Sequence, residues 1–252
     1  MKIVIIGNGV AATSAAAAIR QYDTESSITM LSDERAPFYS RPRLTEYLAG
    51  KVPFEKIVLQ DESWYEKHNI RLLCGARVDS VIPTRREISG SFGQLDYDRL
   101  LIASGASAAL PSFYHPPLAQ VFTLRTKEDA DFIAAAAASS HSVAVIGGGL
   151  LGIETAYALA ERRLEPTVME VFDRLLPKQL DDESAHMLQG MLVRRGLRFL
   201  LAMQTVSISN EFGKVWLQFQ DTTALRVDMA IISAGIRPNI AFLKNSQIDV
   251  GR

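Results

Sequence analysis

The sequence predicts an α/β protein with parallel sheets, because the order strand, glycine turn, helix occurs twice along it. In the clearer case the apolar residues 143–146 lead into glycines at positions 147, 149 and 152 and then into a helix-like segment. The first glycine permits a sharp turn, the second lets the backbone approach a pyrophosphate, and the third lets the helix pack closely on the strand. The pattern therefore indicates a dinucleotide-binding fold.

The same pattern stands at the start of the chain. A strand from Lys2 leads into glycines at positions 7 and 9, and Ala12 takes the place of the third glycine. A chain of 252 residues is long enough for two domains with separate cores. We therefore expect two Rossmann-like domains, each a three-layer β/β/α or α/β/α structure, and two bound nucleotides.

Composition and charge argue against several other classes of protein. The net charge of −1 provides no global field that would attract nucleic acid or an anionic membrane. No apolar run approaches the roughly 18 residues that a membrane-spanning helix needs. The single cysteine, Cys74, cannot form an intrachain disulfide, which favours a reducing cytoplasm. The four histidines share no spacing, so no metal site is expected.

In the first half of the chain, the alanine-rich residues 10–20 should form a crossover helix. The strand expected at 27–31 runs into Asp33 and Glu34, about 24 residues after Gly9, where a carboxylate would bind an adenosine ribose. Asp33 is the better candidate and Glu34 the second. The alternative is a pair of acids on a solvated loop.

The segment from 37 to 117 mixes loops with short elements. Residues 37–44 join two prolines to an aromatic pair and two arginines, a loop that can clamp an anion. Short helices are expected at 45–50 and 62–68, and a β-meander at 71–96. Cys74 is interpreted as a small buried residue rather than a reactive thiol. A buried strand then precedes a linker rich in proline and small residues, which marks a domain boundary.

The second half repeats the order of the first. A helix at 127–138 precedes the central strand, and a crossover helix at 153–163 follows it. The next strand, 167–171, places Glu170 about 21 residues beyond Gly149, again at the position of a ribose-binding carboxylate. An amphipathic helix and further strands complete this half, at 181–195, 197–203, 214–219 and 227–233.

These motifs resemble those of the pyridine nucleotide-disulfide oxidoreductase superfamily, in which an NAD(P)H domain is inserted in an FAD domain. The resemblance covers essentially the whole chain, and it is greatest to the nitrite reductase large subunit and rubredoxin reductase branch. The segments that carry it are Tyr39-Ser-Arg-Pro42, Leu44-Thr-Glu46, Leu101-Ile-Ala-Ser-Gly105, residues 147–154 and Ala234-Gly-Ile-Arg-Pro-Asn239. It implies an FAD domain at 1–115, an NAD(H) domain at 116–240 and a return segment that starts at 241–252.

The resemblance also implies which residues bind the two cofactors. For FAD these are Gly7, Gly9, Ala11, Ala12, Asp33, Glu34, Arg41, Pro42, Ser104 and Gly105. For NAD(H) they are Gly147, Gly149, Leu151, Gly152, Glu170 and Gly235. Glu154 would lie near the nicotinamide and is the candidate catalytic residue. The alternative for Glu154 is an acid that stabilises the first turn of a helix.

Two departures from the family pattern are informative. Glu46 occupies the position at which some members carry a lysine beside the flavin, which argues against those subfamilies. The family's further strand, with an acidic residue for the ribityl chain, is not found between residue 240 and Arg252. We therefore expect a truncated protein that retains FAD less well than a longer one.

The expected function is transfer of hydride from NADH to FAD and of electrons onward to an acceptor protein or domain. The cofactors carry this chemistry, so no catalytic triad or carboxylate pair is required. NADH should be preferred over NADPH because Glu170 would repel a 2′-phosphate, with Arg174 as the possible counterweight. The alternative is a nucleotide-binding or sensor fragment without turnover. The sequence does not identify the acceptor.

Overall fold

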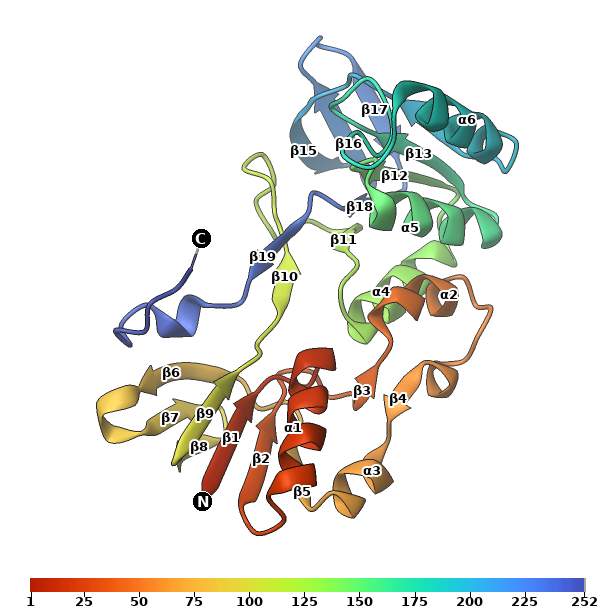
Figure 1. Ribbon diagram of the computed structural model, residues 1–252. Coiled ribbons are helices and arrows are strands. Elements are labelled where there is room, and N and C mark those ends of the chain that lie inside the picture. The colour runs from red at the N-terminus through yellow and green to blue at the C-terminus, as the bar shows by residue number, and fades with distance from the viewer. Residues whose placement is uncertain (252) are drawn as a thin grey trace. The chain divides into compact units, whose positions relative to one another are not determined.

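The computed structural model describes residues 1–251 and divides them into two compact units. Unit 1 comprises Met1–Ser40, Glu55–Ser107 and the described residues from Arg237 onward, and unit 2 comprises Arg41–Phe54 and Ala108–Ile236. Each unit contains a parallel sheet with helices, which confirms the predicted α/β class (Figure 1). The strands β10 (Ala106–Ala108) and β19 (Ile236–Pro238), where the chain crosses between units, pair with each other.

Unit 1 is built on a sheet with the strand order β5-β2-β1-β9. These strands are β1 (Lys2–Ile6), β2 (Ser27–Leu31), β5 (Ile70–Leu73) and β9 (Arg99–Ile102). The helices of this unit are α1 (Val10–Tyr22) and α3 (Glu62–Lys67). A β-meander is formed by β6 (Val78–Ile82), β7 (Glu87–Gly90) and β8 (Gly93–Asp96). Two short strands, β3 (Phe38–Tyr39) and β4 (Val58–Gln60), pair with each other.

Side chains of β1 alternate between the two faces of this sheet and enter two different cores. Val4 and Ile6 pack in a cluster with residues of the β6-β7-β8 meander. Ile3 and Ile5 pack in another cluster with Ala12 and other residues of α1 and α3. Unit 1 is therefore a meander, a parallel sheet and a helical layer, which is the β/β/α form of the predicted three-layer fold.

Unit 2 repeats this plan with the strand order β11-β18-β12-β13-β14. Its parallel strands are β11 (Val121–Thr123), β12 (Ser142–Ile146), β13 (Glu165–Met169), β14 (Arg198–Leu200) and β18 (Met229–Ile232). Its main helices are α4 (Lys127–Ala137), α5 (Leu150–Glu161) and α6 (Asp182–Val193). The meander β15 (Thr205–Glu211), β16 (Lys214–Phe219) and β17 (Ala224–Val227) packs on one face through Val215 and Leu217.

Residues 41–54 belong to unit 2 although the sequence places them in the range expected for the first domain. Their helix α2 (Leu44–Leu48) contacts α4 and α5, as Figure 1 shows, and both of its leucines are buried. The hydroxyl of Tyr47 donates a hydrogen bond to Asp131 of α4 at 2.6 Å. The sequence of a five-residue helix does not predict which residues about eighty positions away it will contact. Only the contacts in the structure therefore show that α2 belongs to unit 2.

Two other expectations need correction. Cys74 is exposed rather than buried, because β5 ends at Leu73 and the thiol begins the turn into Gly75. The strand expected at 227–233 is interrupted at Asp228, which separates β17 from β18. The carboxylate of Asp228 accepts hydrogen bonds from the N–H groups of His141 and Ser142, at 2.9 and 2.8 Å, and so fixes the turn to the start of β12.

Replacement of Asp228 by asparagine is expected to destabilise unit 2 by about 2 kcal/mol, because one side chain serves several hydrogen bonds, including one from the Lys214 ammonium. Burial raises the pKa of Asp228, but the bonds from Lys214, Ser142 and His141 outweigh it and hold the pKa well below its usual range. The stabilisation is therefore present above pH about 4 and is lost as the pH falls from there towards the folded-state pKa.

Urea denaturation of the wild type and of Asp228→Asn at pH 7 and at pH 3 would measure both effects. We expect the difference in the free energy of unfolding between the two proteins to be smaller at pH 3 than at pH 7. An equal difference at both values would contradict the proposed role of the charge.

None of the helices within residues 1–251 combines the length and the apolar character that crossing a membrane requires.

Candidate functional site

The turn after β12 has the geometry that the glycine pattern predicts. Gly147 has φ of 118°, a conformation open to glycine, and its N–H donates to the carbonyl of Met169 at 2.8 Å. A β-carbon on Gly152 would lie 2.0 Å from the carbonyl oxygen of Gly147, so the helix can approach the turn only because this residue is glycine. Apart from Gly149 itself and its two chain neighbours, no protein atom lies within 4 Å of its β-carbon position. The space beside Gly149 is therefore available to a ligand.

Glu170 follows β13 directly and is 8% exposed. One carboxylate oxygen accepts a hydrogen bond from the N–H of Gly148 at 2.7 Å, and the other accepts one from the N–H of Phe172 at 3.1 Å. The carboxylate is thus fixed against the glycine turn. Each oxygen has a second lone pair, so both can still accept a hydrogen bond from a ribose hydroxyl.

A pocket of about 240 Å³ lies on the other side of this turn. Its wall brings together Gly149, Leu151 and Gly235, three of the residues assigned to NAD(H). The remaining lining residues are Ala108, Leu124, Arg125, Leu150, Ile232, Ser233 and Ile236. Sequence reasoning missed Arg125, the charged member of the wall. The available signal was its place directly before the Thr126–Asp129 capping box that begins α4.

Arg125 is held through its backbone. Its N–H donates to the carboxylate of Asp129 at 2.8 Å, and its carbonyl accepts a hydrogen bond from the Arg41 guanidinium at 2.7 Å. Arg41 and Pro42 lie in the 3-10 turn Arg41–Arg43 of unit 2, whereas the other residues assigned to FAD lie in unit 1. No single compact unit therefore contains the whole predicted FAD set.

Glu154 lies in the second turn of α5 and is partly buried. Burial raises the pKa of its carboxyl group. It is not among the residues that line the 240 Å³ pocket, so its placement near the nicotinamide stays a prediction.

The first glycine turn reproduces the second. The N–H of Gly7 donates to the carbonyl of Leu31 at 2.7 Å, and a β-carbon on Gly7 would lie 2.1 Å from the carbonyl oxygen of Ala103. The β-carbon position of Gly9 has no protein atom within 4 Å, as at Gly149. Ala12 is fully buried against the sheet, whereas Ala11 is exposed.

The backbone bonds also show which residue of unit 1 corresponds to Glu170. The N–H of Glu170 donates to Leu200 and its carbonyl accepts from Met203, and the same two bonds join Ser32 to Leu73 and Ala76. Ser32 therefore holds the equivalent strand-end position.

The two acids predicted for the adenosine ribose of FAD follow Ser32 at the next positions. Asp33 is exposed, and the half-buried Glu34 accepts a hydrogen bond from the Tyr39 hydroxyl at 2.5 Å. Their roles stay predictions, because neither acid occupies the place that Glu170 has in unit 2.

The turn at Ser104 and Gly105 is tied to the segment that follows β19. The Ser104 hydroxyl donates to the carbonyl of Asn239 at 2.7 Å, and the Asn239 amide donates back to the carbonyl of Ser104 at 3.0 Å. Gly105 has φ of 67° and accepts from the Asn239 N–H at 2.9 Å. Hydrogen bonds thus join two motifs that are far apart in the sequence within unit 1.

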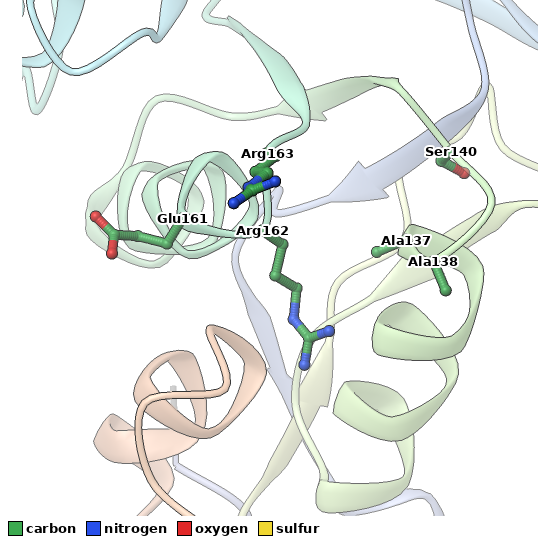
Figure 2. Close-up of a pocket in the computed structure, with 6 residues that line it drawn as sticks. All are labelled: Ala137, Ala138, Ser140, Glu161, Arg162 and Arg163. Atoms are coloured by element: carbon green, nitrogen blue, oxygen red, sulfur yellow. The ribbon is translucent and has the colours of Figure 1, made fainter.

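A second pocket, of about 440 Å³, contains none of the predicted site residues. Figure 2 shows that it lies between the last residues of α4 and α5, at the opposite end of α5 from the glycine turn. The Arg162 side chain extends from α5, and its Nε donates to the carbonyl of Leu48. Glu161 forms an ion pair with Lys51 at 3.2 Å. These contacts fasten the segment 41–54 to the end of α5, so Glu161 and Arg162 have a structural role.

Groups of three or more His, Cys, Asp or Glu side chains that could hold a metal ion are not found within residues 1–251.

The chain is similar in sequence to several curated oxidoreductases. It is 31% identical to the assimilatory nitrate reductase electron transfer subunit of Bacillus subtilis, over 100% of this chain and 33% of that protein. It is 35% identical to the nitrite reductase [NAD(P)H] large subunit of Klebsiella oxytoca, over 89% and 23%. It is 29% identical to the rubredoxin-NAD(+) reductase of Pseudomonas putida, over 99% and 66%. The chain thus spans between about a quarter and two thirds of these relatives.

Solved structures show the same relationship. A NAD-dependent persulfide reductase from A. fulgidus superposes with a TM-score of 0.93 at 28% identity, over 100% of this chain and 49% of that one. The sequence model of the pyridine nucleotide-disulphide oxidoreductase family matches residues 1–252 of this chain. The chain therefore belongs to the pyridine nucleotide-disulphide oxidoreductase family, whose members are FAD-dependent NAD(P)H oxidoreductases.

Proposed function

We propose that this chain is a module that transfers hydride from NADH to FAD and passes electrons to an acceptor protein or domain. The observation that carries the proposal is the fixed carboxylate of Glu170 on the N–H of Gly148, beside the open space at Gly149. A buried acid at a strand end, next to a glycine turn, is the arrangement that binds the ribose and pyrophosphate of a dinucleotide. The first turn has the same open space at Gly9 and would bind the pyrophosphate of FAD.

Bound FAD would supply the hydride acceptor, and the residues of the chain would bind and orient the two nucleotides. The first N–H groups of α1 and α5 have no acceptor within their own helices and point towards the turns. Gly7, Gly9 and Ala12 would shape the FAD turn, and Ser104 and Gly105 would bring backbone close to the cofactor. Asp33 or Glu34, Arg41 and Pro42 complete the proposed FAD contacts.

In the second site, Gly147, Gly149 and Gly152 would shape the turn and Glu170 would bind the ribose. Leu151 and Gly235 would form the pocket wall. We assign Glu154 to the nicotinamide side on the family resemblance of residues 147–154. Burial raises the pKa of its carboxyl group.

The acceptor is proposed to be a redox protein or domain. Relatives named for nitrite reductase and rubredoxin reduction support this class. A structure of putidaredoxin reductase in covalent complex with putidaredoxin is also similar, with a TM-score of 0.91 at 26% identity. The single cysteine is consistent with a reducing compartment such as the cytoplasm.

Absorption spectroscopy of the purified chain tests the proposal. We expect flavin absorbance, and we expect NADH to bleach it under anaerobic conditions. A protein that binds NADH without flavin would instead be a nucleotide-binding or sensor fragment without turnover. A protein that retains flavin but is not reduced by NADH would contradict the hydride-transfer assignment.

NADH is expected to bind about tenfold or more tightly than NADPH, because Glu170 is buried and held by two N–H groups and therefore cannot turn away from a 2′-phosphate. The guanidinium of Arg174 is already paired with two carboxylates, so it is not available to neutralise Glu170 or to bind a 2′-phosphate. Its guanidinium lies 3.1 Å from Asp182 and 3.5 Å from Asp173.

Titration of the protein with each nucleotide would measure the preference. Glu170→Gln removes the charge and keeps the side-chain volume. This variant should have a smaller difference between its affinities for NADH and NADPH. Tighter binding of NADPH by the wild type would contradict the assignment of Glu170.

A further inference from the structure

Helix α6 of unit 2 presents two large apolar side chains to solvent on one face. Met187 is 65% exposed and Met191 is 54% exposed. They are four positions apart and are therefore neighbours on the helix surface. A different face of α6 packs in the core of the unit, where Leu188 and Leu192 contact the buried cluster that contains Leu175. The two methionines lie outside this packing.

Two charged residues extend the face of the methionines towards the ends of the helix. Glu183 lies about one turn before Met187, and Arg194, the helical C-cap residue, lies about one turn after Met191. Since successive residues are rotated by about 100° around a helix axis, all four side chains lie in one stripe along α6. Both charged residues are exposed. The face therefore has an acidic end, an apolar centre and a basic end.

The charges at the two ends are not used within unit 2. Neither Glu183 nor Arg194 forms an ion pair in the part of the chain that the structure describes, residues 1–251. Their neighbours in sequence do have partners. Asp182 pairs with Arg174 at 3.1 Å, and the guanidinium of Arg195 donates to the Tyr157 hydroxyl at 2.8 Å.

This face is complementary to a second copy of itself when the two helices run antiparallel. A two-fold axis at the level of Gln189 places Met187 of one copy against Met191 of the other. The same axis brings Glu183 of each copy next to Arg194 of the other, with an axial mismatch of about 1.5 Å, the rise of one residue. Two apolar contacts and two ion pairs would therefore form together.

We propose that α6 is an interface through which two copies of this chain associate, with their helices antiparallel. The residues of this α6 face are Glu183, Met187, Gly190, Met191 and Arg194. Gly190 has no side chain to separate the two helices, and unbranched methionine side chains adapt readily to a partner surface. A single pair of helices buries less area than a standard interface, so the dimer is weak and depends on concentration. The proposal is independent of the two nucleotide sites.

Sedimentation velocity of the full chain over a series of concentrations up to about 1 mM tests for such a weak dimer. The dimer fraction should rise with protein concentration and fall with added salt, which screens the exposed ion pairs. Glu183→Arg turns both ion pairs into pairs of like charge, and so does Arg194→Glu. Each variant should raise the dimer Kd by about tenfold or more.

The two variants also test the antiparallel arrangement. In an equimolar mixture of Glu183→Arg and Arg194→Glu, opposite charges meet at both ends of the helix pair. The mixture should therefore form a dimer as the wild type does, and so should the double variant, in which the two charges are exchanged.

Val193 provides a matched control for the apolar centre. It is 52% exposed on the same helix but lies about 120° from Met187 around the helix axis. Val193→Ser should leave the dimer Kd unchanged, whereas Met187→Ser should raise it by about tenfold through loss of apolar contact. Circular dichroism of both variants would verify that they remain folded.

Three results would overturn the proposal. A wild type that stays monomeric at every concentration would show that the α6 face does not bind a second copy. A dimer that neither charge reversal weakens would show that the copies associate through another surface. If the two variants are monomeric separately and also in the mixture, Glu183 and Arg194 do not meet across a two-fold axis and the arrangement is wrong.

Discussion

Gly149→Val is expected to abolish NADH binding while the protein stays folded. Gly149 has φ of −76° and ψ of 175°, a conformation that valine adopts readily, and no protein atom lies within 4 Å of its β-carbon position. The new side chain would therefore project into the space in which the pyrophosphate approaches the N–H groups of α5. We expect the Kd for NADH to rise by about a hundredfold or more, equivalent to about 2.8 kcal/mol.

Titration with NADH and circular dichroism of the same samples would measure binding and folding. Gly9→Val is the matched variant in unit 1, where the β-carbon position is equally open. It should weaken FAD binding and leave NADH binding to unit 2 unchanged. Near-normal affinity of Gly149→Val for NADH would show that the nucleotide does not approach this turn.

The parts of the site that could be predicted from the sequence are those that local geometry determines. A glycine turn needs a left-handed residue at Gly147 and a small one at Gly152, and both requirements can be read from residue type alone. Glu170 was predicted from its spacing of about 21 residues beyond Gly149, inside a strand expected at 167–171, and the structure has it directly after β13. The three-layer plan follows from the strand and helix order.

The parts that could not be predicted depend on contacts between distant residues. Nothing in the five residues of α2 indicates that Leu44 and Leu48 are buried in unit 2. Arg125 is at the pocket wall because the sheet and helix α4 place it there, and its own neighbours in sequence show only a helix cap. Asp228 interrupts an apolar run because of hydrogen bonds to residues 141 and 142, which local periodicity does not contain.

The two halves of the chain also differ where the sequence suggested equivalence. Both strand ends are followed by acids, and the spacing from the glycine turn is similar. The backbone hydrogen bonds nevertheless show that Ser32, which is not an acid, is the residue of unit 1 equivalent to Glu170 in unit 2. Spacing cannot resolve a shift of one or two positions at a strand end, because the helix between the glycine turn and the strand differs in length, with 13 residues in α1 and 12 in α5.

Gly152→Ala is expected to destabilise unit 2, which a substitution at Gly149 should not do, although the two residues are three positions apart. The added methyl group would lie 2.0 Å from the carbonyl oxygen of Gly147 and 3.4 Å from the side chain of Ser233. The first contact is with backbone that is itself bonded to Met169, so α5 must move away from the sheet. Overpacking of this kind costs about 1–3 kcal/mol, and we expect a value near the upper end because the obstructing atom cannot rotate away.

Urea denaturation would measure this loss directly, with Gly149→Ala as the control that adds the same methyl group in open space. Displacement of α5 would also move its first N–H groups away from the pyrophosphate, so Gly152→Ala should bind NADH more weakly even under conditions in which it is fully folded. A variant as stable as Gly149→Ala, to within about 0.5 kcal/mol, would mean that the helix can slide along β12 without loss of packing. In that case the third glycine would not be required for the close approach of α5 to the turn.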